Sequence, residues 1–185
     1  MSHARHPAPA GDAPAPHTPA SVAARPGKYL TITLGRESYG IPVLSVREII
    51  RLCPITRVAN MPPQVRGVIN LRGKVIPVVD LRTRFGLPAA PDHDRTCIVV
   101  TQVAATVGPG TRLYGLIIDG VEEVAHFHAA DIQPTPDFGG AIDTRFLTGM
   151  ANTAAGVTAL IDLDAIAAAE TAPPPEAADA PPTSA

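Results

Sequence analysis

The chain has 185 residues, of which 45% are hydrophobic and 17% charged, and its formal net charge is −2. Its two cysteines, Cys53 and Cys97, lack the spacing of a metal or redox pair, and no apolar run approaches the ~20 residues that cross a bilayer. The N-terminus also lacks the uninterrupted apolar segment of a signal peptide. These features argue against secreted, disulfide-stabilised and membrane-spanning proteins, and they predict a cytoplasmic protein with reduced thiols.

Both ends of the chain have a composition that disfavours folding. Residues 1–27 contain six prolines and eight alanines, and residues 171–185 contain five of each. Such segments cannot bury enough apolar surface to offset the conformational entropy that folding removes. We therefore predict disordered tails over residues 1–27 and 171–185, and one folded domain over residues 28–170.

Charges are divided unevenly along this domain. Residues 28–84 hold ten Lys or Arg and three Asp or Glu, whereas residues 85–170 hold three and eleven. The two halves could therefore present a basic and an acidic surface to different partners. Alternatively, strand exchange between subdomains would mix the two sets of charges.

Taken in order, the chain predicts about ten short strands separated by turn residues. They are Lys28–Leu34, Tyr39–Val43, an extended part of Val43–Arg51, Ile55–Val58, Val65–Leu71, Lys74–Leu81, Arg95–Val103, Leu113–Asp119, Val121–Phe127, and strands near Arg145–Met150 and Val157–Asp162. A helical turn is predicted at Leu81–Leu87 and a terminal helix at Leu163–Ala169, while Gly108-Pro109-Gly110 and Pro134–Gly140 form loops. This pattern is typical of an all-β protein made of small barrels or a sandwich.

The segment Val65–Phe85 is predicted to be a central β-hairpin. Its two strands are rich in valine and isoleucine and meet at Arg72-Gly73, where a glycine adopts positive φ without steric cost. The second strand has apolar residues on both faces, which predicts that it is covered on both sides. A second strand pair is predicted around the turn dipeptide Asp119-Gly120.

Motifs of catalysis and metal binding are absent from the sequence. There is no GxSxG elbow, no GxxxxGK[ST] loop and no GxGxxG before a helix. His126 and His128 share a strand face with Asp131 nearby, but two ligands on one strand do not complete a metal site. A nucleic-acid-binding barrel using the basic first half is the alternative function, although the few aromatic residues are scattered rather than clustered for base stacking.

Five blocks of the sequence carry a resemblance to a known family. They are YGIPVLSVREIIR from Tyr39, ITRVANMPPQVRGVINLRGKVIPVVDLRTRFGL from Ile55, LYGLIIDGVEEV from Leu113, IQPTP from Ile132 and RFLTGM from Arg145. In their order and spacing these blocks resemble the CheW family of chemotaxis coupling proteins, over essentially Lys28 to Ala169. The tails lie outside the resemblance.

The resemblance implies an all-β fold of two intertwined SH3-like five-stranded β-barrel subdomains with a short C-terminal helix. It also implies a non-catalytic coupling protein, with no active site, metal or cofactor. Such proteins link the cytoplasmic tip of a methyl-accepting chemotaxis receptor to the regulatory domain of a CheA-type histidine kinase. The protein would reach membrane receptor arrays through these partners, without membrane insertion and without binding nucleic acid.

The family's binding residues fall on seven positions of this chain. They are Arg72, Glu48, Asn70, Gly73, Gly67, Val46 and Val124. A guanidinium can bond a carboxylate in bidentate fashion, so we predict that Arg72 pairs with Glu48 at the rim of a receptor-binding groove. If the pair were substantially buried, loss of one partner would cost about 3–5 kcal/mol.

The other positions are predicted with narrower roles. At Gly67 a side chain would obstruct the close approach of another backbone segment. Val46 and Val124 match apolar positions that flank the groove in the family, and a core role is at least as well supported for both. For Arg72 and Glu48, separate positions on solvated surfaces remain the alternative to pairing.

Overall fold

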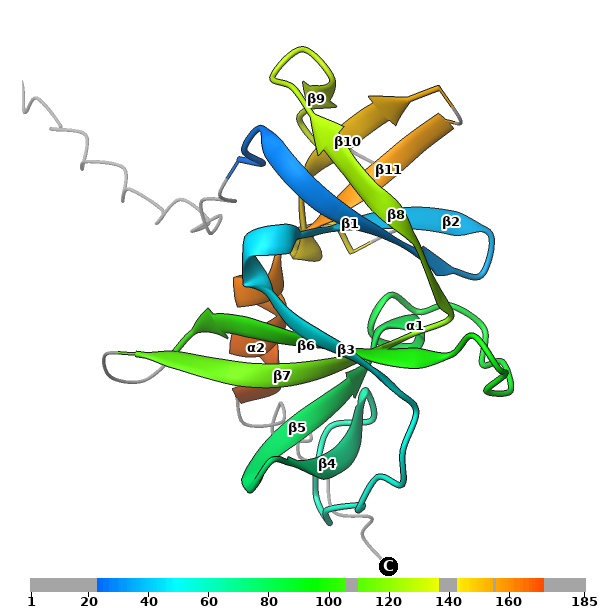
Figure 1. The fold of residues 1–185 in the computed structure, drawn as a ribbon, viewed down its shortest axis with the longest axis vertical. Helices are drawn as coiled ribbons and strands as arrows, with labels where there is room; N and C mark the ends of the chain where they lie inside the picture. Colours follow the sequence, from blue (N-terminus) through cyan, green and yellow to red (C-terminus); the bar gives the residue numbers. More distant parts are fainter. Residues whose placement is uncertain (1–22, 106–109, 137–142, 155, 172–185) are drawn as a thin grey trace, which may run out of the picture.

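Two β-sheets form the body of the molecule, with one above the other in Figure 1. The structure is a computed structural model that describes residues 23–105, 110–136, 143–154 and 156–171. The first sheet has the strand order β8-β1-β2-β11-β10-β9 and the second has the order β3-β6-β7-β5-β4.

The strands are short, as the alternating apolar pattern predicts. Those of the first sheet are β1 (Gly27–Leu34), β2 (Glu37–Pro42), β8 (Gly120–Phe127), β9 (Ile132–Gln133), β10 (Leu147–Thr153) and β11 (Gly156–Ile161). Those of the second sheet are β3 (Val46–Arg51), β4 (Val65–Leu71), β5 (Lys74–Asp80), β6 (Cys97–Ala104) and β7 (Thr111–Ile118). The helical segments are η1 (Val43–Ser45), α1 (Leu81–Arg84), η2 (Thr144–Phe146) and α2 (Leu163–Thr171).

The chain passes from the first sheet to the second and back again. It builds β1 and β2, crosses at η1 to the five strands of the second sheet, and returns with β8. This arrangement confirms the predicted all-β fold of two intertwined SH3-like subdomains with a short C-terminal helix. The second sheet has the five expected strands, and the first gains a sixth in the two-residue β9.

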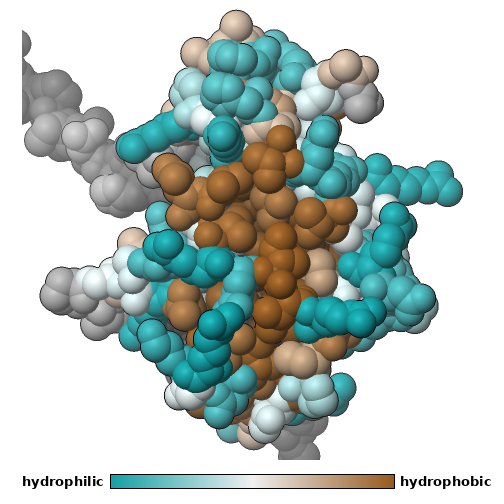
Figure 2. Space-filling view, in the orientation of Figure 1, coloured by the Kyte–Doolittle hydropathy of each residue, from teal (hydrophilic) through white to brown (hydrophobic). Residues whose placement is uncertain are grey.

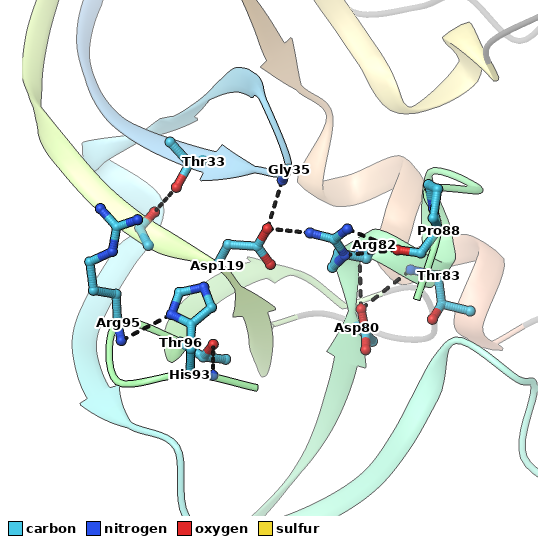
Figure 3. A network of polar contacts seen from close by, with 11 residues as sticks. Thr33, Gly35, Asp80, Arg82, Thr83, Pro88, His93, Arg95, Thr96 and Asp119 are labelled. Carbon is cyan, nitrogen blue, oxygen red and sulfur yellow. Dashed lines mark hydrogen bonds and ion pairs between the residues drawn. The ribbon is translucent and has the colours of Figure 1, made fainter. Parts of the chain in front are cut away.

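The predicted strand pair around Asp119-Gly120 is wrong. Strand β7 pairs with β6 and β5 in the second sheet, whereas β8 pairs with β1 in the first. The dipeptide is therefore a crossover and not a hairpin turn. The Asp119 side chain holds this crossover in place. Its carboxylate accepts a hydrogen bond from the Gly35 amide and pairs with the Arg82 guanidinium (Figure 3).

Those bonds make Asp119 the centre of a polar junction between the sheets. Gly35 lies in the β1–β2 turn of the first sheet, and Arg82 lies on α1, directly after β5 of the second. The Arg82 guanidinium also donates to the Pro88 carbonyl, and Asp80 caps α1 by accepting from the amides of Arg82 and Thr83 (Figure 3). We call the Asp119–Arg82–Gly35 contacts the inter-sheet junction.

The predicted strand Ile55–Val58 is wrong as well, because only one residue of it pairs. Thr56 forms an isolated bridge with Val68 of β4, with two backbone hydrogen bonds of 2.9 and 2.8 Å. Proline residues on both sides, at Pro54 and at Pro62, lack the amide donor that a longer ladder would require.

The core has a part that both sheets share. Its fully buried residues include Ile32 and Leu34 of β1, Val79 of β5, Val99 of β6 and Ile118 of β7. Two smaller apolar clusters lie within the subdomains, one around Val78 and Ile98 and one around Tyr29 and Leu160. Burial of β5 is confirmed for most of residues 76–80, whereas Val75 near the hairpin tip is 68% exposed.

The N-terminal boundary of the packed chain lies slightly before the predicted Lys28. The Ala24 amide donates to the Thr148 carbonyl of β10, and the Tyr29 hydroxyl donates to the Arg25 carbonyl. Residues 24–27 thus lie against the first sheet, where we predicted the end of a tail. At the other end, α2 extends through Thr171, the first residue of the predicted C-terminal tail. Residues 1–22 and 172–185, the Gly108-Pro109 loop tip and most of the Pro134–Gly140 loop lie outside the described residues. No helix in the described ranges is long and apolar enough to span a membrane.

Candidate partner-binding site

The tip of the β4–β5 hairpin is a two-residue turn. Leu71 pairs with Lys74, and the intervening Arg72 and Gly73 have φ angles of 51° and 83°. Positive φ at both central residues defines a type I′ turn, whose twist matches that of the flanking strands. Asn70 supports the turn because its Oδ1 accepts a 2.9 Å hydrogen bond from the Gly73 amide.

Arg72 occupies an unfavourable position in this turn. A left-handed conformation costs a residue with a Cβ atom about 1–2 kcal/mol, and turns of this type favour Asn, Asp or Gly. Backbone strain of this kind persists mainly at functional positions. An arginine therefore stands where local stability alone would favour a smaller residue.

The predicted pairing of Arg72 with Glu48 is confirmed. The Arg72 Nη2 lies 2.9 Å from the Glu48 Oε2, so the hairpin tip is joined to strand β3. The pair is at the surface, since the Arg72 side chain is 81% exposed and that of Glu48 25%. The cost of 3–5 kcal/mol expected for a buried pair does not apply, because exposed pairs contribute about 0–1 kcal/mol. Most of the guanidinium's donors face solvent and are free to bond a partner.

Gly67 is required for the hairpin's attachment to the preceding segment. Its φ is 142°, and a Cβ added there would lie 2.1 Å from the Thr56 carbonyl oxygen. The predicted close backbone approach is thus present. Gly67 is itself buried, so its contribution to binding would be indirect, through the position of the hairpin.

Val46 and Val124 lie on the edge strands of different sheets. Val46 is partly buried on β3 and packs against the shared core, whereas Val124 on β8 is 55% exposed. Figure 2 shows a hydrophobic band that runs from the region of β8 across β3 and β7 towards β4 and β5. Three exposed apolar residues that sequence reasoning did not select lie on or next to these edge strands, namely Ile49 on β3, Val121 on β8 and Leu44 on η1, directly before β3.

The missed residues differ in whether the sequence could have indicated them. The alternation of apolar and polar residues around Val121 does not indicate whether its side chain is buried. Ile49 is followed by Ile50, and such an apolar pair is equally typical of a buried core strand. Leu44 on η1 is 91% exposed, and its position in the crossover between the sheets is not visible in the sequence. A contiguous apolar surface of this kind marks an interaction site.

The uneven division of charge survives folding. Residues 44–119, which build the second sheet, hold ten Lys or Arg and five Asp or Glu. Residues 23–43 and 120–171, which build the first, hold four and nine. The two subdomains therefore differ in the sign of their net charge, and the apolar band runs from one to the other.

Chemistry beyond docking has little basis in the described residues. No three His, Cys, Asp or Glu residues gather there in a way that could hold a metal ion. The rings of His126 and His128 lie 4.6 Å apart, and His128 Nδ1 is 3.4 Å from an Asp131 oxygen. Cys53 and Cys97 are free thiols, and burial raises the pKa of the Cys97 thiol.

Taken together, the fold and the site define an adaptor built from two SH3-like subdomains with an apolar docking face. Comparison with known proteins identifies its family, since the model of the CheW-like domain matches residues 28–171. The chain belongs to the CheW-like domain family, and it is a chemotaxis coupling adaptor.

Individual relatives agree with this assignment. The chain is 34% identical to a chemotaxis protein CheW of Klebsiella aerogenes, over 77% of this chain and 82% of that protein. It is 33% identical to a chemotaxis protein CheW of Rhizobium meliloti, over 75% and 86%. The crystal structure of the scaffolding protein TtCheW from Thermoanaerobacter tengcongensis superposes with a TM-score of 0.68 at 33% identity, covering 76% of this chain and 91% of that one. Nothing in these comparisons supports the alternative nucleic-acid-binding function.

Proposed function

We propose that the protein links the cytoplasmic tip of a methyl-accepting chemotaxis receptor to the regulatory domain of a CheA-type histidine kinase. It does so as a scaffold without catalysis of its own, so phosphotransfer belongs to the kinase. It acts in the cytoplasm and reaches membrane receptor arrays through its partners. Membership of the CheW-like family supports this proposal.

The observation that carries the site assignment is the strained, exposed Arg72 at the tip of the β4–β5 hairpin. Its guanidinium is oriented by Glu48 of β3, and the same strand carries Val46 and the exposed Ile49. An apolar surface with an oriented cation at its rim suits an amphipathic helical partner whose polar flank offers carboxylate or carbonyl oxygens. Asn70 and Gly73 fix the turn that presents Arg72.

The proposed receptor- and kinase-binding residues also include Gly67, Val46 and Val124. Gly67 holds the hairpin against Thr56, and the valines contribute apolar surface on the two edge strands. The proposal therefore treats Arg72 and Glu48 as the polar rim, and it treats Val46 and Val124 as the apolar surface that excludes water from the contact.

The test is a binding measurement with two probes. These are the signalling-tip fragment of a chemoreceptor and the regulatory domain of a CheA-like kinase, both from the genome that encodes this chain. We expect the wild-type protein to bind both, and Arg72→Glu to lose receptor binding while its circular dichroism spectrum is unchanged. Arg145→Glu is the matched control, because Arg145 is a similarly exposed, ion-paired arginine on the first subdomain.

Two outcomes would contradict the proposal. A wild-type protein that binds neither probe would reject the coupling function. A folded Arg72→Glu variant with full receptor affinity would remove Arg72 from the site while leaving the coupling function in place.

A further inference from the structure

Helix α2 connects the two subdomains. It begins directly after β11 of the first sheet, where the Asp162 Oδ1 accepts a hydrogen bond of 2.9 Å from the Ala165 amide. Leu163 and Ile166 are buried in the core that both sheets share. Asp164 accepts a 3.0 Å hydrogen bond from the Ala104 amide at the end of β6 in the second sheet. The first turn of the helix is therefore already attached to both sheets.

The last turn of α2 holds a buried carboxylate. The Glu170 side chain is only 3% exposed, and its Oε1 lies 2.7 Å from the Arg84 Nη2. The Gln64 Nε2 donates a hydrogen bond of 3.1 Å to the Oε2. Burial raises the pKa of Glu170, and the charge of Arg84 opposes that rise. A carboxylate removed from solvent in this way needs both partners to offset its desolvation.

These two partners stand at the two ends of the β4–β5 hairpin. Gln64 immediately precedes β4, and Arg84 lies on α1, which follows the last residue of β5. The ends are also bonded to each other, because the Gln64 carbonyl accepts a 2.8 Å hydrogen bond from the Asp80 amide. Glu170 thus contacts the base of the hairpin on both sides, while Arg72 occupies its tip.

Arg84 extends the connection back to the first subdomain. Its guanidinium carbon lies 4.3 Å from the centroid of the Phe146 ring on η2, which leads into β10. Among the described residues the Arg84 Nε and Nη2 and the Glu170 Oε1 form no hydrogen bond of suitable geometry, so the arginine is held by the electrostatic attraction of the ion pair and by the ring face. The hairpin base is therefore tied to α2 and to the first sheet through one arginine.

We propose that Glu170 is a positioning residue for receptor binding, which holds the base of the β4–β5 hairpin so that Arg72 at the tip stands beside Glu48 of β3. This inference rests on the proposed function. Loss of the carboxylate detaches Gln64 and Arg84 from α2, and a small rotation of the hairpin base then becomes a larger displacement at the far end, where Arg72 meets Glu48 of β3. The contact with α2 matters because β4 is an outer strand of its sheet, with β5 as its neighbour on one side only.

The experiment compares three variants of the full chain. Glu170→Gln removes the charge at nearly constant shape. The double variant Arg84→Met with Glu170→Met replaces the buried ion pair by apolar side chains, a change that commonly preserves stability. Asp143→Asn is the matched control, because it breaks an exposed ion pair with Arg145 on the first subdomain. Each is measured by urea unfolding, by peptide-level hydrogen exchange and by affinity for the receptor signalling-tip fragment.

We expect Glu170→Gln to speed amide exchange in residues 65–80 about tenfold, with β1 and β8 unchanged, and to weaken receptor binding by a similar factor. The double variant should recover the urea midpoint of the wild type but keep the fast hairpin exchange and the weak binding. Asp143→Asn should change neither exchange nor binding.

Two results would overturn the inference. Receptor affinity that recovers together with stability in the double variant would show that Glu170 acts only on folding. Unchanged hairpin exchange in Glu170→Gln would show that the tie does not position the hairpin. A wild-type protein that fails to bind the receptor fragment rejects the proposed function instead, and the exchange measurement then still decides whether Glu170 holds the hairpin.

Discussion

The inter-sheet junction and the hairpin tip each contain an arginine–carboxylate pair, and the two pairs differ in exposure. At the junction the side chains of Arg82 and Asp119 are 17% and 18% exposed, whereas Arg72 at the tip is 81% exposed. The junction pair also satisfies backbone groups, namely the Gly35 amide and the Pro88 carbonyl. Arg72 bonds only a side chain, and its own backbone is strained.

This difference predicts a structural role for the pair between the sheets and a docking role for the pair at the hairpin tip. A largely desolvated ion pair with backbone partners stabilises the packing of one sheet against the other. Loss of either side chain would leave a buried charge unpaired and backbone groups without hydrogen bonds. A solvated pair on a strained turn contributes little to stability and keeps its donors accessible. Mutations at the junction should therefore act on folding, and mutations at the tip should act on binding.

The largest effect on stability is expected at the buried glycine of the hairpin. In Gly67→Ala the new methyl group would meet the Thr56 carbonyl, and the backbone would keep an unfavourable positive φ. Overpacking and backbone strain together should lower the free energy of unfolding by about 3–4 kcal/mol, measured by urea denaturation.

Gly73→Ala at the tip is the control for this comparison. It shares the positive φ but has nothing within 4 Å of the added Cβ, so a loss of about 1 kcal/mol is expected. Equal losses at the two glycines would show that the Thr56 contact contributes nothing, and that the hairpin base is no more constrained than its tip.

The next effect concerns the junction itself. Arg82→Met should lower the free energy of unfolding by about 2–3 kcal/mol, below the full range for a buried pair because both side chains keep some solvent contact. Arg145→Met, which breaks an exposed pair with Asp143, should change it by less than about 1 kcal/mol. A smaller loss for Arg82→Met than for Arg145→Met would refute the structural role of the junction.

Sequence reasoning recovered the hairpin because its signals are local. Strand periodicity, the Arg72-Gly73 turn and the need of Glu48 for a partner can all be read within a few dozen residues. The Arg72–Glu48 contact joins segments 24 residues apart, and the resemblance to a known family placed both residues in one site. Their exposure was not predictable, because it depends on how β3 packs at the edge of its sheet.

The junction was missed for the opposite reason. Asp119-Gly120 carries the composition of a hairpin turn, and nothing local shows that the next strand joins another sheet. Its partner Gly35 lies 84 residues away, so the contact exists only in the folded chain. Glu170 was overlooked similarly, since an acid near a chain end reads as a solvated residue until Arg84 and Gln64 are seen to enclose it.

At the tip, a substitution should separate stability from binding. Arg72→Asn relieves the left-handed strain and loses only an exposed ion pair, so the free energy of unfolding should rise by about 0.5–1 kcal/mol. Receptor affinity should fall about tenfold or more, because an oriented guanidinium is lost from the rim. Urea denaturation and a binding titration measure the two quantities. A variant that is less stable and binds normally would reverse the roles assigned to tip and junction.

The smallest expected effect is a change in the pH dependence of stability, with opposite signs at two carboxylates. Glu170 has a raised pKa through burial, so the folded state binds its proton more readily than the unfolded state. Its stability contribution therefore improves as the pH falls from above the folded-state pKa towards the unfolded value near 4.5. Asp143 has a pKa lowered by its hydrogen bond from Arg145, so its contribution is lost as the pH falls below the unfolded value of 3.8.

Urea unfolding of the wild type, Glu170→Gln and Asp143→Asn across this pH range tests both signs. The advantage of the wild type over Glu170→Gln should grow on acidification from neutral pH, because the neutral carboxyl no longer bears the cost of a buried charge. Its advantage over Asp143→Asn should instead shrink at the acid end. If the stability difference from the wild type changed with pH in the same way for both variants, Glu170 would be as well solvated as Asp143. The ion pair at the hairpin base would then not differ from an exposed one.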